Sequence, residues 1–327
     1  MSEPLVLACD LGGTKMLAGL FTHQGDLLAA EKYLIGDRAG PADVLDDLDG
    51  ALERMLRTAG RQRAAVTALG FGSTGVLDLE AGTVVMNHNL GWRDVPLGRL
   101  ALQRLGLPVA LEMDANAAAL GEFWRGAGRG LQNFAFVIVG TGIGAGLILD
   151  GRIVHGAHSA AGEVGHTVIL PGGPLCGCGK HGCLEALASG LALSRRAEAA
   201  VKLGRATVLS QHAPGISGQH VADAARAGDA VAREIMAEAA FYLGVGLANI
   251  ITLLDPQSII IGGGVGAGAF DLLQAPLNQS IQQHLNYWAA RDIPIQPSTL
   301  GEHAGLYGAA RAALNIVSHP SIDEVKK

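Results

Sequence analysis

The stretch EVGHTVILPGGPLCGCGKHGCLE, residues 163–185, is the most informative part of this sequence. It contains three of the four cysteines of the chain, together with two histidines and two glutamates. Cys176, Cys178 and Cys183 with His166 form a ligand set that is typical of a tetrahedral zinc site without an open coordination position. We therefore expect a structural zinc that fixes this loop, while the chemistry lies in the residues that the loop carries.

Two alternatives to this zinc site remain at the level of sequence. His181, between Cys178 and Cys183, is the competing fourth ligand. A disulfide between two of the cysteines is the other alternative. It is disfavoured because no cationic and apolar leader follows Met1, and because Cys9 lies in an apolar run typical of a buried free thiol. We therefore expect a cytoplasmic protein with reduced cysteines.

The composition restricts the classes of function. A chain of 327 residues is long enough for two domains with separate cores. The net charge of −6 argues against a nucleic-acid partner, because phosphate backbones are bound by clustered lysine and arginine. The sequence predicts no apolar run of the roughly 18 to 20 residues that span a bilayer, so we also expect no membrane association.

One local pattern occurs twice in the chain: a strand, a glycine turn, a second strand, a tight turn and a third strand. The first copy comprises residues 4–9, the DLGGTK turn at residues 10–15, residues 16–21, and a strand after residues 24–26. The second comprises residues 134–139, the GTGIG turn at residues 140–144, residues 145–149, and residues 152–154. Such a repeat predicts two related α/β halves.

The remaining elements alternate between helices and strands. Asp114 is expected to be the N-cap of the helix that follows it. The predicted helices cover residues 42–59, 115–124, 218–253, 270–285 and 304–317, and the further strands residues 65–71, 108–113, 258–261 and 294–297.

The two glycine turns predict a phosphate-binding function. Without a Cβ, the backbone amides of a glycine turn can approach phosphate oxygens closely and form an anion-binding nest. Gly12 and Gly13 in the first turn, with Gly140 and Gly142 in the second, would hold a triphosphate. Asp10 is placed to bind Mg²⁺ through water. The alternative for the first turn alone is an ordinary hairpin.

A dinucleotide-binding enzyme that transfers hydride is the alternative from another class. The pattern G-x-G-x-x-A occurs at residues 140–145 and again at residues 262–267. The first copy precedes a strand where a helix is required. The second precedes a helix, but the next strand does not end in an acidic residue and too little chain follows. Hydride transfer is therefore disfavoured.

With the DLGGTK turn, the second glycine turn and CGCGKHGCLE at residues 176–185, the chain resembles the ROK family of sugar kinases and regulators, and most closely its bacterial glucokinase branch. The resemblance implies the actin-like, ribonuclease H-like ATPase fold, an α/β fold in which two domains flank a cleft. Residues 1–114 with 304–327 would form the small domain, and residues 115–303 the large domain with the zinc loop. It also implies ATP-dependent phosphorylation of a hexose at its 6-hydroxyl, and a homo-oligomer, either a dimer or a tetramer.

The resemblance also implies a role for particular residues. Asp114 would be the catalytic base that takes the proton of the 6-hydroxyl. Glu163, His166 and Glu185 would bind sugar hydroxyls, for which carboxylates are good acceptors. His166 could bind zinc with one ring nitrogen and the sugar with the other. The expected contacts to ATP are Asp10, Gly12, Gly13, Thr14, Lys15, Gly140, Thr141, Gly142, Gly262, Gly263 and Gly264.

One departure from the family pattern leaves the substrate open. The family usually has E-N-D before the base, whereas this chain has Glu112-Met113-Asp114. Methionine can neither donate strongly nor accept well, so one sugar contact would be lost. An N-acylhexosamine or fructose kinase, a polyphosphate donor, and a non-catalytic sugar sensor are the alternatives. A DNA-binding regulator is disfavoured, because a strand beginning near Leu5 leaves no room for a helix-turn-helix module.

Overall fold

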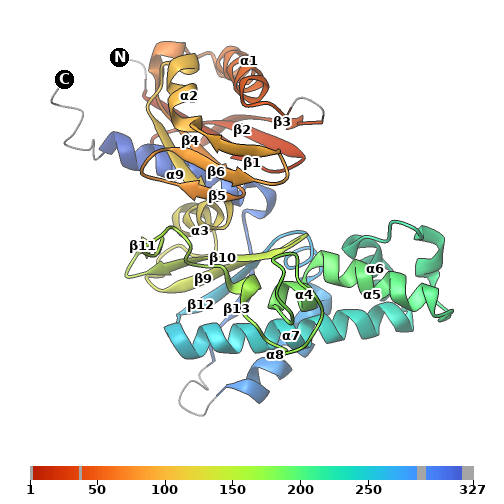
Figure 1. Cartoon of the computed structure of the whole chain (residues 1–327). Helices are drawn as coiled ribbons and strands as arrows, with labels where there is room; N and C mark the ends of the chain where they lie inside the picture. The colour runs from red at the N-terminus through yellow and green to blue at the C-terminus, as the bar shows by residue number, and fades with distance from the viewer. Residues whose placement is uncertain (1–2, 37–38, 286–291, 319–327) are drawn as a thin grey trace. The chain divides into compact units, whose positions relative to one another are not determined.

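The computed structural model describes residues 3–36, 39–285 and 292–318, and the chain forms two compact units (Figure 1). The first unit comprises Met1–Arg129, His155–Ser159 and Glu302–Lys327, and the second comprises Gly130–Val154 and Ala160–Gly301. Residues 319–327, which the sequence interpretation assigned to the first domain, lie outside the described residues.

A five-stranded sheet in the order β3-β2-β1-β4-β8 forms the centre of the first unit. Its strands are β1 (Leu5–Leu11), β2 (Lys15–Thr22), β3 (Leu27–Leu34), β4 (Val66–Ser73) and β8 (Val109–Met113). β1, β4 and β8 are parallel, and their last residues Leu11, Ser73 and Met113 are aligned in register. The sheet therefore brings the DLGGTK turn and the predicted base to the same edge.

Helices cover both faces of this sheet because side chains alternate along β1. On one face of the sheet, Leu5 and Leu7 belong to a core that also contains the helices of residues 41–59 and 97–105. On the other face, Val6 and Ala8 pack against the C-terminal helix. The helices of the unit are α1 (Pro41–Ala59), α2 (Leu97–Leu105), α3 (Asp114–Arg125) and α9 (Ala304–Ser318). A small antiparallel sheet contains β5 (Val76–Asp78), β6 (Thr83–Asn87) and β7 (Trp92–Val95).

The start of α3 differs from the prediction in one respect. Met113 is the N-cap, with extended φ and ψ of −67° and 146°, and Asp114 is the first helical residue. The Oδ1 atom of Asp114 accepts a hydrogen bond from the amide of Ala115 at 2.8 Å. The carboxylate therefore lies at the N-terminus of the helix, which is the positive end of the helix dipole.

The division between the units differs from the predicted boundary between residues 114 and 115. It falls after Arg129, because α3 packs against α9 and so belongs to the first unit. The segment His155–Ser159 also joins the first unit, although the chain on both sides of it belongs to the second. The sequence shows neither of these long-range contacts.

The second unit repeats the sheet topology of the first, with the order β11-β10-β9-β12-β13. Its strands are β9 (Phe134–Val139), β10 (Ile143–Leu149), β11 (Arg152–Ile153), β12 (Ser258–Gly262) and β13 (Ile295–Pro297). In both sheets an antiparallel hairpin is joined to a parallel strand through its first member. The repeat predicted from the sequence is therefore present in the structure.

The helices of the second unit enclose one apolar core. They are α4 (Leu184–Ala188), α5 (Gly190–Lys202), α6 (Gly218–Arg226), α7 (Ala230–Leu254) and α8 (Phe270–His284). The single helix predicted for residues 218–253 is wrong, because α6 and α7 are separated by a turn. Gly228 has a φ of +99° there, and the side chain of Asp229 caps α7 by accepting from the Ala232 amide.

The prediction that no apolar segment is long enough to span a bilayer is wrong for α7. This helix of 25 residues is long and apolar enough to span a bilayer by length and composition. Its buried residues, however, belong to the core of the second unit. A core helix has the same composition as a membrane span, so α7 is explained by its packing.

Glycines let the backbones of the first unit approach unusually closely. A Cβ added to Gly308 in α9 would lie 1.5 Å from the carbonyl oxygen of Ala117 in α3. One added to Gly121 would lie 2.1 Å from the oxygen of Ala304, and one on Gly70 of β4 would lie 1.9 Å from that of Ala309. Since these obstacles are backbone atoms, no rotamer change can relieve them.

We predict that Gly308→Ala destabilises the protein by about 1–3 kcal/mol or more, because the added methyl forces α3 and α9 apart. Gly50→Ala is the matched control, since Gly50 is also inside a helix but its Cβ would meet only the flexible guanidinium of Arg54 at 3.2 Å. That control should stabilise by about 0.5–1 kcal/mol. Urea unfolding measures both, and equal effects of the two substitutions would contradict the packing described for α9.

Candidate active site

Two carboxylates mark the sheet edge of the first unit. Asp10 is the penultimate residue of β1, and Asp114 directly follows β8. Burial raises the pKa of Asp10 to about 7, the negative charge of Asp114 adds to the rise, and Lys15 opposes it. A cation at this edge would favour the charged form of both groups.

A hydrogen-bonded glutamate for which the sequence predicted no role supports the start of α3. Glu112 is 5% exposed, and its Oε1 accepts from the Met113 amide and from the Asn116 side chain at 3.0 and 3.1 Å. Its Oε2 lies 2.8 Å from Nε2 of His155. This hydrogen bond raises the pKa of His155, partly opposed by burial. His155 thereby fastens the segment His155–Ser159 to the strand before Asp114.

The DLGGTK turn is enclosed by charged and polar neighbours. Glu302, which precedes α9, accepts a hydrogen bond from Lys32 at 2.8 Å and lies 3.5 Å from the ammonium group of Lys15. A Cβ on Gly13 would lie 2.4 Å from Cβ of Asn89, so the loop after β6 packs directly on the turn. Gly13 is therefore required by a close approach as well as by the proposed phosphate contact.

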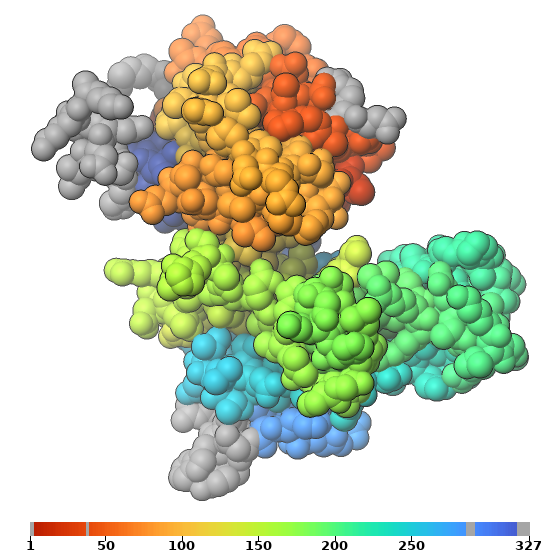
Figure 2. All heavy atoms as spheres, viewed as in Figure 1, coloured from red at the N-terminus to blue at the C-terminus, as the bar shows by residue number. Residues whose placement is uncertain are grey.

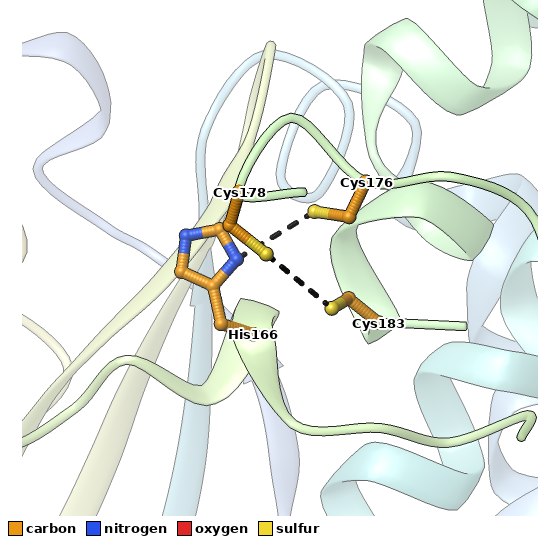
Figure 3. Close-up of side chains that lie close together, drawn as sticks. All are labelled: His166, Cys176, Cys178 and Cys183. Carbon is orange, nitrogen blue, oxygen red and sulfur yellow. Dashed lines mark hydrogen bonds between the residues drawn. The ribbon is translucent and has the colours of Figure 1, made fainter. Parts of the chain in front are cut away.

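In the second unit, the four expected zinc ligands converge. His166, in the 3-10 helix Val164–His166, and Cys176, Cys178 and Cys183 point their side chains toward one another (Figure 3). Their ligand atoms all lie within 4.8 Å of one another. The green segment around residue 180 lies at the surface on the face shown in Figure 2. Of its cysteines, Cys178 is exposed, whereas Cys176 and Cys183 are buried.

The spacing of these atoms fits a tetrahedral zinc ion. Bond lengths of about 2.3 Å to sulfur and about 2.0–2.1 Å to nitrogen place tetrahedral ligands about 3.6–3.8 Å apart. Sγ of Cys178 lies 3.7 Å from Sγ of Cys183, and Sγ of Cys176 lies 3.7 Å from Nδ1 of His166. The separation of the two sulfur atoms is too long for a disulfide, and the cysteines are free. His181 does not converge with the other four residues, and its Nδ1 lies 2.9 Å from the carbonyl oxygen of Gly173.

The cysteines differ in acidity. Burial raises the pKa of Cys176 to about 12, whereas hydrogen bonding from the Lys180 backbone contributes most to lowering the pKa of Cys178. Three thiolates at this spacing repel one another, so a cation among them favours their joint deprotonation. The donor set therefore suits a metal ion that takes thiolates.

The two expected sugar-binding glutamates have different surroundings within the second unit. Oε2 of Glu163 lies 4.0 Å from Nε2 of His166, the ring nitrogen that does not face the cysteines. Oε2 of Glu185 accepts a hydrogen bond from the Ile143 amide at 3.1 Å, and Oε1 lies 3.7 Å from Sγ of Cys176. The four converging residues His166, Cys176, Cys178 and Cys183 are called the metal set below. Glu185 thus contacts both the metal set and the second glycine turn.

The two glycine-rich segments of the second unit are neighbours. β9 and β12 are parallel, so the turn at Gly140 and the turn at Gly262 follow the same edge of the sheet. Gly263 has a φ of +86°, and a Cβ there would lie 2.4 Å from the carbonyl oxygen of Val139. The amide of Val265 also donates to that oxygen at 3.0 Å. The second unit therefore brings together the turns expected to bind phosphate and adenosine.

Met113 is half-buried and packs against the core that contains α1 and α2. Its side chain thus fills space beside the expected base. The asparagine that is usual in the family at this place has no equivalent here.

Comparison with known proteins gives the class. The ROK family model matches residues 6–316, and the chain belongs to this family. The glucokinase of Streptomyces coelicolor is 36% identical to this chain, and the alignment covers 94% of this chain and 97% of the length of that glucokinase. The resemblance inferred from the sequence motifs is thereby confirmed.

Solved structures give the fold. The ROK hexokinase from Thermus thermophilus is 37% identical, with a TM-score of 0.80 over 96% of this chain and 99% of that chain. A ROK family glucokinase from Streptomyces griseus, solved in complex with glucose and AMPPNP, is 35% identical, with a TM-score of 0.80 over 95% of this chain and 99% of that chain. The predicted actin-like ATPase fold is confirmed.

We predict a pH-dependent contribution of the Glu112–His155 pair to stability. The pKa of His155 is higher in the folded protein than in the unfolded chain. Its stabilisation is therefore complete below the unfolded value of about 6.5 and is lost as the pH rises through the folded value. The Tm difference between wild type and His155→Gln should be larger at pH 6 than at pH 8.5. The exposed His88, replaced in the same way, is the control, and a difference that grows with pH would contradict the pair's role.

Proposed function

We propose that this protein is an ATP-dependent hexose kinase that transfers the γ-phosphoryl group to the 6-hydroxyl of a glucose-like sugar. The similarity over nearly the whole chain to a ROK glucokinase solved with glucose and AMPPNP carries this proposal. The alignment of Leu11, Ser73 and Met113 at one sheet edge supports it, because Asp10 and Asp114 adjoin that edge.

Asp114 is the general base of the proposed reaction. It accepts the proton of the 6-hydroxyl while the sugar oxygen forms its bond to the γ-phosphorus and the bond to ADP breaks. The Ala115 amide orients Oδ1, and the N-terminus of α3 favours the charged carboxylate that can accept this proton. Glu112 supports the same strand end through its three hydrogen bonds.

Asp10 is the residue proposed to hold Mg²⁺ through water. When bound, the ion neutralises charge on the phosphate oxygens. The pKa of Asp10, about 7 with Asp114 nearby, fits this assignment because a divalent cation would favour the deprotonated carboxylate. Gly12, Gly13, Thr14 and Lys15 would contact phosphates from the first unit.

The other proposed ligands are residues of the second unit. Gly140, Thr141 and Gly142 are proposed to bind phosphate, and Gly262, Gly263 and Gly264 to bind the adenosine. Glu163, His166 and Glu185 are proposed to accept and donate hydrogen bonds to sugar hydroxyls. Zinc would be held by Nδ1 of His166 and by the three cysteines, leaving Nε2 of His166 for the sugar.

We also propose a location, an oligomeric state and a preferred sugar for the enzyme. A cytoplasmic homo-oligomer, a dimer or tetramer, is what the family resemblance implies. The preferred sugar is proposed to be a glucose-like aldohexose, with N-acylhexosamines and fructose as the competitors to include in an assay. Met113 makes this comparison informative, since its thioether does not replace the hydrogen bonds of an asparagine.

We predict that Asp114→Asn lowers kcat by about 10²- to 10⁴-fold, because the amide cannot accept the hydroxyl proton. The binding of sugar and ATP should change little, since the side chain keeps its size. Asp150→Asn, at the exposed turn between β10 and β11, is the control and should be fully active. Retention of more than about half of the wild-type kcat in Asp114→Asn would disprove the assignment.

We also predict that the purified protein binds about one zinc ion per chain. Cys178→Ser should lose most of this zinc and raise the KM for sugar, because His166 is then no longer anchored. Loss of such support costs about 10- to 100-fold in metal affinity or activity. Cys9→Ala, which alters the buried thiol of the first unit, should retain the metal. Elemental analysis measures both variants, and a zinc-free wild type would refute the site.

A further inference from the structure

Glu185 links the metal set to the second glycine turn. It is the second residue of α4, and the metal-ligand residue Cys183 is the N-cap of that helix. Its Oε2 is hydrogen-bonded to the Ile143 amide, and its Oε1 faces Cys176. A Cβ on Gly142 would lie 2.4 Å from Oε2, so the carboxylate packs directly against the turn.

The chain that follows Glu185 holds the rest of the turn. The Gly190 amide donates to the carbonyl oxygen of Gly140 at 2.8 Å, and the Leu191 amide donates to that of Thr141 at 3.3 Å. Within the turn, the Gly140 amide donates to the oxygen of Gly142 at 3.0 Å. The conformation of the turn therefore depends on the position of α4 and of the start of α5.

The loop that carries His166 holds the same region from its other side. The Ala145 amide donates to the carbonyl oxygen of Gly162 at 2.9 Å. A Cβ on Gly165 would lie 2.1 Å from the carbonyl oxygen of Ile143. The segment that carries the cysteines is thus packed on the turn, and the segment that carries His166 is packed on the strand β10 that follows the turn.

We propose that Glu185 is a positioning residue for the turn Gly140–Gly142, and that through it metal binding and nucleotide binding strengthen each other. The inference rests on the proposed function, in which this turn binds the phosphates of ATP. A bound metal orders the two loops, so the nucleotide then has less conformational entropy to remove from the turn. Because coupling between two binding sites is reciprocal, the nucleotide must also strengthen metal binding.

This role differs from that of a sugar ligand alone. A glutamate that only accepts sugar hydroxyls would affect the KM for sugar and leave the affinity for ADP unchanged. Glu163 provides the comparison, because it is also a proposed sugar ligand, yet its carboxylate lies near Nε2 of His166 and not on the turn.

The test is the Kd for Mg²⁺–ADP, measured without sugar by calorimetry. Glu185→Ala with zinc still bound should raise this Kd, and removal of zinc from the wild-type protein by a chelator should raise it by about 5- to 150-fold. Glu185→Gln keeps an acceptor oxygen for the Ile143 amide and should restore most of the affinity. Glu163→Ala should leave the Kd for ADP unchanged while raising the KM for sugar.

A second readout follows the metal. Saturating ADP should slow the release of zinc to a chromogenic chelator in the wild type, and should slow it much less in Glu185→Ala. An unchanged Kd for ADP in zinc-loaded Glu185→Ala would overturn the inference while leaving the proposed function intact. No binding of ADP by the zinc-loaded wild type would instead refute the proposed nucleotide site. Circular dichroism checks that the metal-free protein is folded. If the metal-free protein is unfolded, the Kd for ADP of zinc-loaded Glu185→Ala alone tests the inference.

Discussion

The close contact between the backbones of α3 and α9 is the constraint on which the first unit depends. No side chain fits at Gly308 or Gly121, so the two helices lie against each other at backbone distance. The same helix α9 reaches the first strand, since a Cβ on Gly305 would lie 2.7 Å from Oδ2 of Asp10. The position of Asp10 at the end of β1 and that of Asp114 at the start of α3 therefore both follow from how α9 packs.

In the second unit, the residues that hold the glycine turn in place lie beside the metal set. The sheet of the second unit has the topology of the sheet in the first unit. Its glycine turn again joins the two strands of a hairpin, here β9 and β10. Here the turn is held by chain segments around the cysteines and His166, in which the apolar side chains Val168, Leu170 and Leu175 are exposed and do not pack in the core. Converging thiolates and an imidazole can fix such a loop only with a cation, so the proposed zinc would have the role that the packing of α9 has in the first unit.

The sequence predicted those elements and residue clusters that depend on short motifs and on the local spacing of residues. The strand at residues 134–139 is observed with the same limits, and the duplicated hairpins and the convergence of His166 with the cysteines follow from motif and spacing. The short helix α2 and the sheet of β5, β6 and β7 were missed, because brief amphipathic segments carry a weak periodic signal. The bond between Glu112 and His155, 43 residues apart, depends on tertiary folding and has no local signature.

The central claim is that this chain catalyses phosphoryl transfer rather than only binding sugar. The most direct measurement is a phosphorus NMR time course of the wild-type protein with ATP, Mg²⁺ and glucose. A sugar 6-phosphate resonance that grows in step with ADP is the predicted result. Unchanged ATP with glucose and with every competing hexose and hexosamine, although the protein binds one of them, would contradict the account and favour a sugar sensor.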